Sequence, residues 1–381
     1  NTTKKIADWQ GADLTVEEGA CSLIQPGDRR AVVIRLASPR AFTGEAGGPI
    51  LAGSARFPRP HFHLAGLGYT LPEERIASES IEARLAPAYQ RLKLPAGRLE
   101  LMTGIRERRF FPPGTLIGAI SVESGRKALA AAGIDPAEIG ALVHGSVCRD
   151  SLEPATACGV HHALGLPPEC AIFDVSNACL GILTGMTLVA NMIELGQIRA
   201  GLVVGTEDGR SLVENTIHRL NTDHSLKRRD VKPLVASLTI GSASAAAVLS
   251  DSSFAPRASR LLGGAVRAHT THNDLCQSSG LETFMHTDSE LLLREGVAAG
   301  QATFGEFLSE VGWERGDIDR TICHQVGIAH RKLLFEQLEL DSTIDYSTFE
   351  MLGNTGAAAL PSALAMAAET GFLQEASALP C

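Results

Sequence analysis

Short apolar segments that alternate with long helical ones constrain the fold of this chain most strongly. Residues 141–144, 171–175 and 200–205 are short and apolar, as expected of buried strands. Between the last two, residues 180–194 are rich in alanine, methionine and leucine and long enough for a buried helix. Strands that alternate with helices pair in parallel and carry the helices on the faces of the sheet. The order therefore predicts an α/β fold with parallel strands and crossover helices.

A similar order returns later in the chain, which predicts two related halves. Segments 132–144 and 311–324 carry glycine and isoleucine at matching positions before a short apolar run. Such a match indicates an internal repeat of α/β units, here divided into residues 61–250 and 251–381. Residues 1–60 have weak periodicity, and we interpret them as an N-terminal extension.

Composition excludes several classes of protein. Hydrophobic residues make up 44% and charged residues 20%, which excludes a disordered chain. The net charge of -9 argues against nucleic acid as the main partner. Apolar runs stay shorter than the roughly 18 residues that a membrane span needs. The eight cysteines form no C-x-x-C pair, so we expect free thiols in a reducing, cytoplasmic compartment.

One cysteine, Cys179, lies between a predicted strand and the start of a predicted helix. Backbone N–H groups and the helix dipole stabilise a thiolate at such a place, so we expect the pKa of Cys179 to be lowered. The small neighbours Ala178 and Gly181 leave room for a substrate carbonyl. Location alone leaves two interpretations open, a nucleophile or an inert thiol in the core.

Two polar residues of the second half occupy similar junctions. His324 follows a strand predicted over 321–323, and Asn354 lies between Gly353 and Thr355, before an alanine-rich helix. Taken separately, His324 would be explained as a buried histidine with a backbone partner. Asn354 would be explained as an ordinary turn or cap residue. Together with Cys179, they favour one site to which both halves contribute.

The segments 174–179, 324–326 and 353–356 resemble the Cys-His-Asn site of the thiolase superfamily, most closely its ketoacyl synthase III branch. Supporting motifs lie at 103–109 and 263–267, and the similarity extends over about residues 61 to 375. The resemblance implies a thiolase-like fold in which two similar α/β halves form a layered αβαβα body. It also implies acyl transfer through an acyl-enzyme on Cys179, with His324 and Asn354 stabilising an enolate.

The loop 149–157 resembles that of the olefin-pathway, OleA-type thiolases, which join two fatty acyl-CoA molecules head to head without decarboxylation. In that family a glutamate before a proline enters the active site of the partner subunit. The resemblance therefore implies a homodimer in which Glu153 acts in trans and removes the α-proton of the second substrate. A solvated surface glutamate is the other interpretation of Glu153.

The implied substrates are coenzyme A thioesters, or thioesters of an acyl-carrier protein, and no permanently bound cofactor is expected. Two other functions stay open. A decarboxylating ketoacyl synthase III would use malonyl-carrier protein and would not need Glu153. A weakly catalytic partner subunit would bind acyl chains and lend Glu153 to another chain. The resemblance also implies that the closing strand and glycine-rich loop of the family are lacking after Gly371.

Arg106 and Arg267 are candidate contacts for the phosphates of coenzyme A. Histidine pairs such as His269-x-x-His272 are not accompanied by acids or cysteines at a metal-binding spacing. We therefore predict no metal site.

Overall fold

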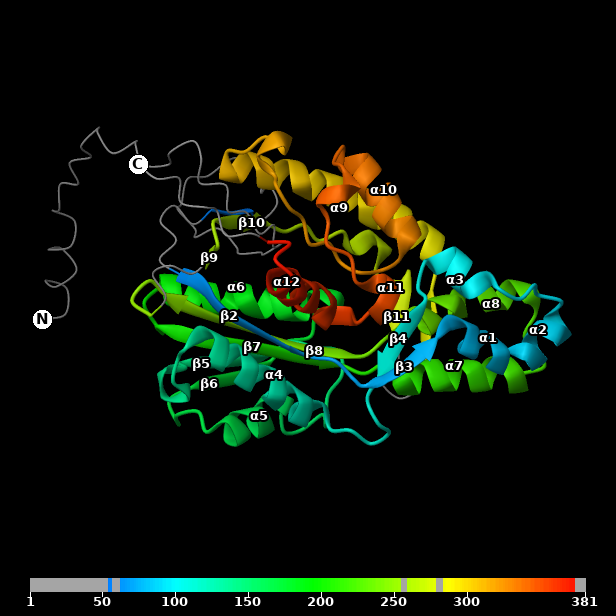
Figure 1. The fold of residues 1–381 in the computed structure, drawn as a ribbon, viewed down its shortest axis with the longest axis horizontal. Helices are drawn as coiled ribbons and strands as arrows, with labels where there is room; N and C mark the ends of the chain where they lie inside the picture. The colour runs from blue at the N-terminus through cyan, green and yellow to red at the C-terminus, as the bar shows by residue number, and fades with distance from the viewer. Residues whose placement is uncertain (1–53, 57–61, 255–258, 279–283, 374–381) are drawn as a thin grey trace, which may run out of the picture.

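The computed structural model describes residues 54–56, 62–254, 259–278 and 284–373. Within these residues the centre is a six-stranded sheet with the order β6-β5-β7-β8-β2-β9 (Figure 1). Its strands are β2 (Phe62–Thr70), β5 (Ala141–His144), β6 (Ala171–Asp174), β7 (Ala200–Glu207), β8 (Ala243–Asp251) and β9 (Ser259–Arg260). The predicted extension 1–60 lies outside the described residues except for β1 (Ser54–Arg56), which pairs with β10 (Gly263–Ala265).

The sheet is mixed and not purely parallel. The predicted parallel pairing is confirmed for β5 with β6 and with β7. In contrast, β8 runs antiparallel to both of its neighbours, β7 and β2. The direction follows from the place at which the chain re-enters the sheet. Ala243 at the start of β8 lies opposite Glu207 at the end of β7. A strand that re-enters at the edge where the previous one left must run in the opposite direction.

Helices cover both faces of this sheet (Figure 1). One face carries α4 (Ile117–Ala132) and α5 (Thr156–Leu164), and the other carries α6 (Gly181–Glu194) and α12 (Ala359–Glu369). Beyond α12 lie the β1–β10 ladder and the helices α9 (Ser289–Val311) and α10 (Ile328–Leu338). Helix, sheet, helix, short ladder and helix thus follow one another in the order expected for a layered αβαβα body.

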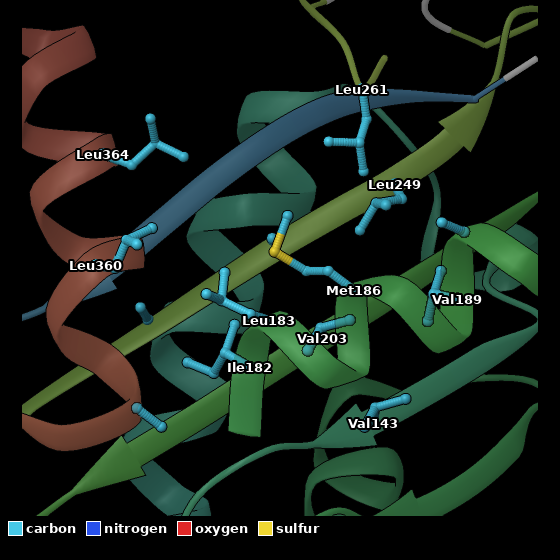
Figure 2. Close-up of a cluster of buried hydrophobic side chains, with 14 of the residues drawn as sticks. Val143, Ile182, Leu183, Met186, Val189, Val203, Leu249, Leu261, Leu360 and Leu364 are labelled. Atoms are coloured by element: carbon cyan, nitrogen blue, oxygen red, sulfur yellow. The ribbon is translucent and has the colours of Figure 1, made fainter. Parts of the chain in front are cut away.

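Apolar side chains fill the space between the sheet and the α6–α12 layer (Figure 2). The cluster joins β5, β7 and β8 to both helices through Val143, Val203, Leu249, Ile182, Leu183, Met186, Val189, Leu360 and Leu364. Full burial of one such side chain contributes about 1.5–3 kcal/mol relative to exposure. The helix that follows Cys179 is therefore fixed to the sheet along its length.

A lobe at one end of the sheet contains shorter elements. They are α1 (Ser78–Arg84), α2 (Ala86–Leu92), α3 (Arg98–Thr103), α7 (Arg210–Thr222), α8 (Arg228–Val235), η4 (Ala236–Thr239), and the paired strands β3 (Glu74–Ala77) and β4 (Glu107–Phe110). Residues 78–92 form two helices and not one, because a proline in the first turn of α2 starts a new helix after Leu85.

The second half contains fewer ladder contacts than its sequence predicts. The strand predicted over 321–323 is an isolated parallel bridge between Thr321 and Asp345. The Asp345 carboxylate accepts hydrogen bonds from Cys323 N and Thr321 Oγ1, so a side chain satisfies groups that a neighbouring strand would satisfy. The other short elements of the second half are η5 (Thr270–His272), β11 (Cys276–Ser278), β12 (Met285–Thr287), η6 (Arg315–Asp317), η7 (Ser342–Ile344), α11 (Phe349–Leu352) and η8 (Gly356–Ala358). A further short helix of the first half is η2 (Pro136–Glu138).

Candidate active site

Cys179 lies in η3 (Ala178–Leu180), the single turn between β6 and α6. Ala178 has a left-handed backbone with φ 43, a strained conformation for a residue other than glycine. The first residue of α6 presses against the loop after β5. A Cβ added to Gly181 would lie 2.6 Å from the carbonyl oxygen of Gly145. The crossing of these two glycines holds the cysteine turn against the end of β5.

The expected low pKa of Cys179 is wrong. Burial raises the pKa of this thiol to about 12, and the negative charge of Glu207 acts in the same direction, followed by Cys276. The backbone N–H of Cys179 lowers the pKa, but by less. A single 3₁₀ turn offers few unpaired N–H groups, and loss of hydration disfavours the thiolate more strongly. Cys179 therefore rests as a protonated thiol and needs a base when it reacts.

His324 lies three residues after Thr321, which forms the isolated bridge, in a segment held by its buried neighbour Gln325. The Gln325 amide donates to Cys323 O and accepts from Thr348 N and Phe349 N. Burial lowers the pKa of His324 to about 4. The imidazole is therefore neutral near pH 7, with one nitrogen that accepts a proton and one N–H that donates.

The free energy of unfolding should depend on pH because His324 is neutral in the folded protein. The folded-state pKa of about 4 lies below the ordinary value of 6.5, so between these pH values only the unfolded chain binds the proton. The contribution is complete above pH 6.5 and is lost as the pH falls toward 4. Between pH 7 and pH 5 the free energy of unfolding should fall by about 1–2 kcal/mol more in the wild type than in His324→Gln. Urea unfolding at both pH values measures this difference, and equal losses in the two proteins would contradict it.

Asn354 is fixed through both its backbone and its side chain. Its N–H donates to Thr239 O and its carbonyl accepts from Gly241 N, both at 2.9 Å. Its Oδ1 accepts from Gly356 N at 3.0 Å. In the described part of the chain nothing accepts a hydrogen bond from its Nδ2. The amide is thus oriented with its donor group available to a substrate oxygen.

The backbone contacts around Asn354 leave no room for a side chain at Gly241. A Cβ there would lie 2.0 Å from Leu352 O, which is a backbone atom that cannot rotate away. We expect Gly241→Ala to lower the free energy of unfolding by about 3 kcal/mol or more. Gly159→Ala is the matched control, since its Cβ would meet nothing within 4 Å inside α5. Thermal unfolding should show a clear loss in the first variant and a small gain in the second.

Packing brings the three segments together. Ile182 after Cys179, Ile322 before His324 and Ala357 after Asn354 belong to one buried cluster. In addition, η3 packs against η8, the turn that follows Asn354. The site therefore draws its thiol from the first half and its imidazole and amide from the second.

A buried carboxylate, Glu207, lies beside the segments of this candidate site and was missed in the sequence. It is 5% exposed at the end of β7, and its oxygens accept hydrogen bonds from Val147 N, Cys148 N and Ala357 N. The sequence prediction ended this strand at residue 205. The signal that could have found it is an acidic residue directly after an apolar run, since charged residues are rarely buried without a role.

Glu153 stands apart from these residues in one chain. It is exposed in the loop between β5 and α5, next to Leu152, which is 94% exposed. The loop is held at both sides. Asp150 accepts hydrogen bonds from the first turn of α4, and Asp174 accepts from the first turn of α5. No contact between Glu153 and Cys179, His324 or Asn354 occurs within the described chain.

The candidate coenzyme A contacts differ in their surroundings. Arg106 is exposed between α3 and β4. Arg267 forms an ion pair with Glu306 of α9, so a phosphate would have to compete for its guanidinium.

The fold places an acidic residue, Glu295, beside the pair His269 and His272, which has no acid at a metal-binding spacing in the sequence. One ligand atom each from His269, His272 and Glu295 lies within 4.8 Å of the others. Both Glu295 oxygens are already engaged, one by Arg294 at 3.4 Å and the other by His272 at 3.6 Å. An ion-pair cluster between η5 and α9 explains this group. Across the described residues, no helix is both long enough and apolar enough to cross a bilayer.

Comparison with known proteins gives consistent matches. Residues 114–283 match the family model of the thiolase N-terminal domain, and residues 308–379 match that of the 3-oxoacyl-[acyl-carrier-protein] synthase III C-terminal region. The acyl-CoA:acyl-CoA alkyltransferase of Shewanella oneidensis is 41% identical, over 82% of this chain and 91% of that protein. The enzyme of the same name from Xanthomonas campestris is 35% identical, over 82% of this chain and 91% of its own length.

Solved structures agree with the sequence matches. A cysteine-to-serine variant of Xanthomonas campestris OleA, with bound lauric acid and lauroyl-CoA, has a TM-score of 0.80 and 33% identity over 83% of this chain and 93% of that one. The cerulenin-bound form of the same protein has a TM-score of 0.78 and 34% identity, over 82% and 90% of the two chains.

Proposed function

The chain belongs to the acyl-CoA:acyl-CoA alkyltransferase family of the thiolase superfamily, and on that premise we propose that it condenses two fatty acyl-CoA molecules head to head without decarboxylation. The proposal is supported by the shared buried cluster that joins the segments of Cys179, His324 and Asn354, by the neutral imidazole of His324 and by the oriented amide of Asn354. In this proposal the half 61–250 supplies Cys179, and the half 251–381 supplies His324 and Asn354.

The first stage forms an acyl-enzyme. The Cys179 sulfur attacks the thioester carbonyl of one acyl-CoA, and the neutral His324 accepts the thiol proton. The backbone N–H of Cys179 donates to the developing oxyanion. When the carbonyl re-forms, the bond to the CoA sulfur breaks, and the leaving thiolate takes the proton from His324. The acyl group is then bonded to Cys179.

The second stage forms the carbon–carbon bond. Glu153 of the partner subunit removes an α-proton from the second acyl-CoA, and the enolate oxygen accepts hydrogen bonds from His324 and the Asn354 amide. The α-carbon attacks the acyl carbonyl, and the Cys179 sulfur leaves and is protonated again. The product is a β-keto thioester or the acid from its hydrolysis, a precursor of hydrocarbons, ketones or β-lactones. Cysteine, histidine, amide and carboxylate complete this chemistry without a permanently bound cofactor.

A homodimer is part of the proposal because Glu153 is exposed and contacts none of the other site residues within the described part of its own chain. Strand β6 lies at the edge of the sheet, pairs only with β5 among the described strands, and exposes Ile172. The exposed apolar side chains Leu116, Val147, Leu152 and Leu180 belong to segments near this edge. An open, apolar strand edge is a common surface for pairing with a second copy. The free cysteines among the described residues and the use of CoA thioesters support a cytoplasmic location for the proposed reaction.

Supplying long-chain acyl-CoA alone tests the function. Release of free CoA together with a β-keto acid, or the ketone from its decay, supports head-to-head condensation. CoA release that requires malonyl-acyl-carrier protein would support the decarboxylating synthase, which the match to the synthase III model keeps as second candidate. Acyl binding without turnover would leave the partner-subunit function.

A further inference from the structure

The Glu207 carboxylate joins two segments of the site to the sheet. Its Oε1 accepts hydrogen bonds from Val147 N at 3.0 Å and from Ala357 N at 3.4 Å, and its Oε2 accepts from Cys148 N at 3.3 Å. Val147 and Cys148 begin the loop that carries Glu153, and Ala357 lies in η8. One buried side chain at the end of β7 thus fastens both segments.

Through η8 the carboxylate reaches Asn354. Gly356, the residue before Ala357, donates its N–H to Asn354 Oδ1 and so sets the orientation of that amide. Gly356 has φ 54, and a Cβ there would lie 3.0 Å from Glu207 Cγ. The glycine therefore lets the turn approach the carboxylate closely.

The same carboxylate also influences the Cys179 thiol. Burial raises the pKa of Cys179 most, and the Glu207 charge raises it further, ahead of Cys276 of β11. Burial likewise raises the pKa of Glu207 above its ordinary value, although its backbone hydrogen bonds and the Cys148 thiol act in the opposite direction. Within the described residues it forms no ion pair, so no cation offsets its charge. Three N–H donors favour the carboxylate form instead.

We propose that Glu207 is a positioning residue for this site: its carboxylate holds the Glu153 loop and the Asn354 turn on the end of β7. The side chain has two parts to test, the position of its oxygens and the charge that they carry. The role of the position rests on the proposed function, whereas an effect of the charge on Cys179 is measured in the free enzyme and does not depend on what the substrate is.

Two substitutions separate the two parts. Glu207→Gln removes the charge but retains an oxygen that can accept from both Val147 and Ala357. We expect alkylation of Cys179 by iodoacetamide at pH 8 to become about tenfold faster, which corresponds to one unit of pKa. Glu207→Asp keeps the charge but withdraws the carboxylate by one methylene group. We expect condensation to fall about 100-fold, with acyl-enzyme formation nearly unchanged, because the Asn354 amide loses its support.

The experiment follows labelling of the Cys179 peptide by mass spectrometry from pH 6 to pH 10 in the wild type and both variants. Glu194→Gln, the same chemical change at the far end of α6, is the control and should label like the wild type. Faster labelling of Glu207→Gln alone and slow condensation by Glu207→Asp are the expected results.

Wild-type condensation by Glu207→Asp would overturn the proposal, and so would a loss of acyl-enzyme formation in that variant as large as its loss of condensation. Equal labelling of Glu207→Gln and wild type, or a wild-type midpoint near the ordinary thiol value of about 8.5, would exclude an effect of the Glu207 charge on Cys179. The midpoint needs no variant, so it is measured even if a substitution prevents folding. If the wild type does not condense lauroyl-CoA, the proposed function fails, while the labelling profiles still decide the effect of the charge.

Discussion

Cys179→Ala should abolish the acyl-enzyme and lower condensation by about 10⁴-fold or more, since alanine has no group that can form the covalent intermediate. Incubation with lauroyl-CoA followed by intact-protein mass spectrometry should show the added lauroyl mass on the wild type and none on the variant. The substitution removes one sulfur from a packed turn, so the variant should remain folded.

Cys158→Ala is the control for this result. Cys158 is a partly buried, free cysteine in α5, and its removal should leave acylation unchanged. Lauroyl mass on Cys179→Ala, or its loss from Cys158→Ala, would move the nucleophile to another cysteine.

Glu153→Gln should separate the two stages of the reaction. Acyl-enzyme still forms, because Cys179 and His324 are intact, but condensation falls by about 10³-fold for want of a base. The measurement is a single burst of CoA release without β-keto product. Glu123→Gln, an exposed glutamate on α4, should behave as the wild type.

Mixing two inactive variants tests whether Glu153 acts in trans. In a mixed dimer of Cys179→Ala and Glu153→Gln, one site combines the intact Cys179 of one chain with the intact Glu153 of the other. Random exchange of subunits should then restore about a quarter of the wild-type activity, since half of the dimers are mixed and each has one working site. If Glu153 acts within its own chain, the mixture stays inactive.

The sequence predicts the elements of the first half well because their apolar periodicity is strong. Strands β5, β6 and β7 and helix α6 lie within about two residues of their predicted ranges. The antiparallel direction of β8 was not predictable, since periodicity within a strand carries no information on its direction. The strand before His324 failed for a different reason: Asp345 satisfies its polar groups through a side chain.

The candidate site could likewise be predicted only in part from the sequence. The motifs around Cys179, His324 and Asn354 are local, so residue type and position indicate them. The protonation state of Cys179 is not local, because it depends on the charge of Glu207 at the end of another strand and on burial by the second half. Glu153 is also indicated only by resemblance, and its environment is that of an exposed loop in one chain.

The protonated resting state of Cys179 has a consequence for the survival of the enzyme under oxidative stress. Peroxides react with thiolates, and susceptibility follows thiolate character and exposure. A partly buried thiol whose pKa is raised to about 12 offers almost no thiolate at neutral pH. The free enzyme should therefore resist formation of sulfenic acid at its nucleophile.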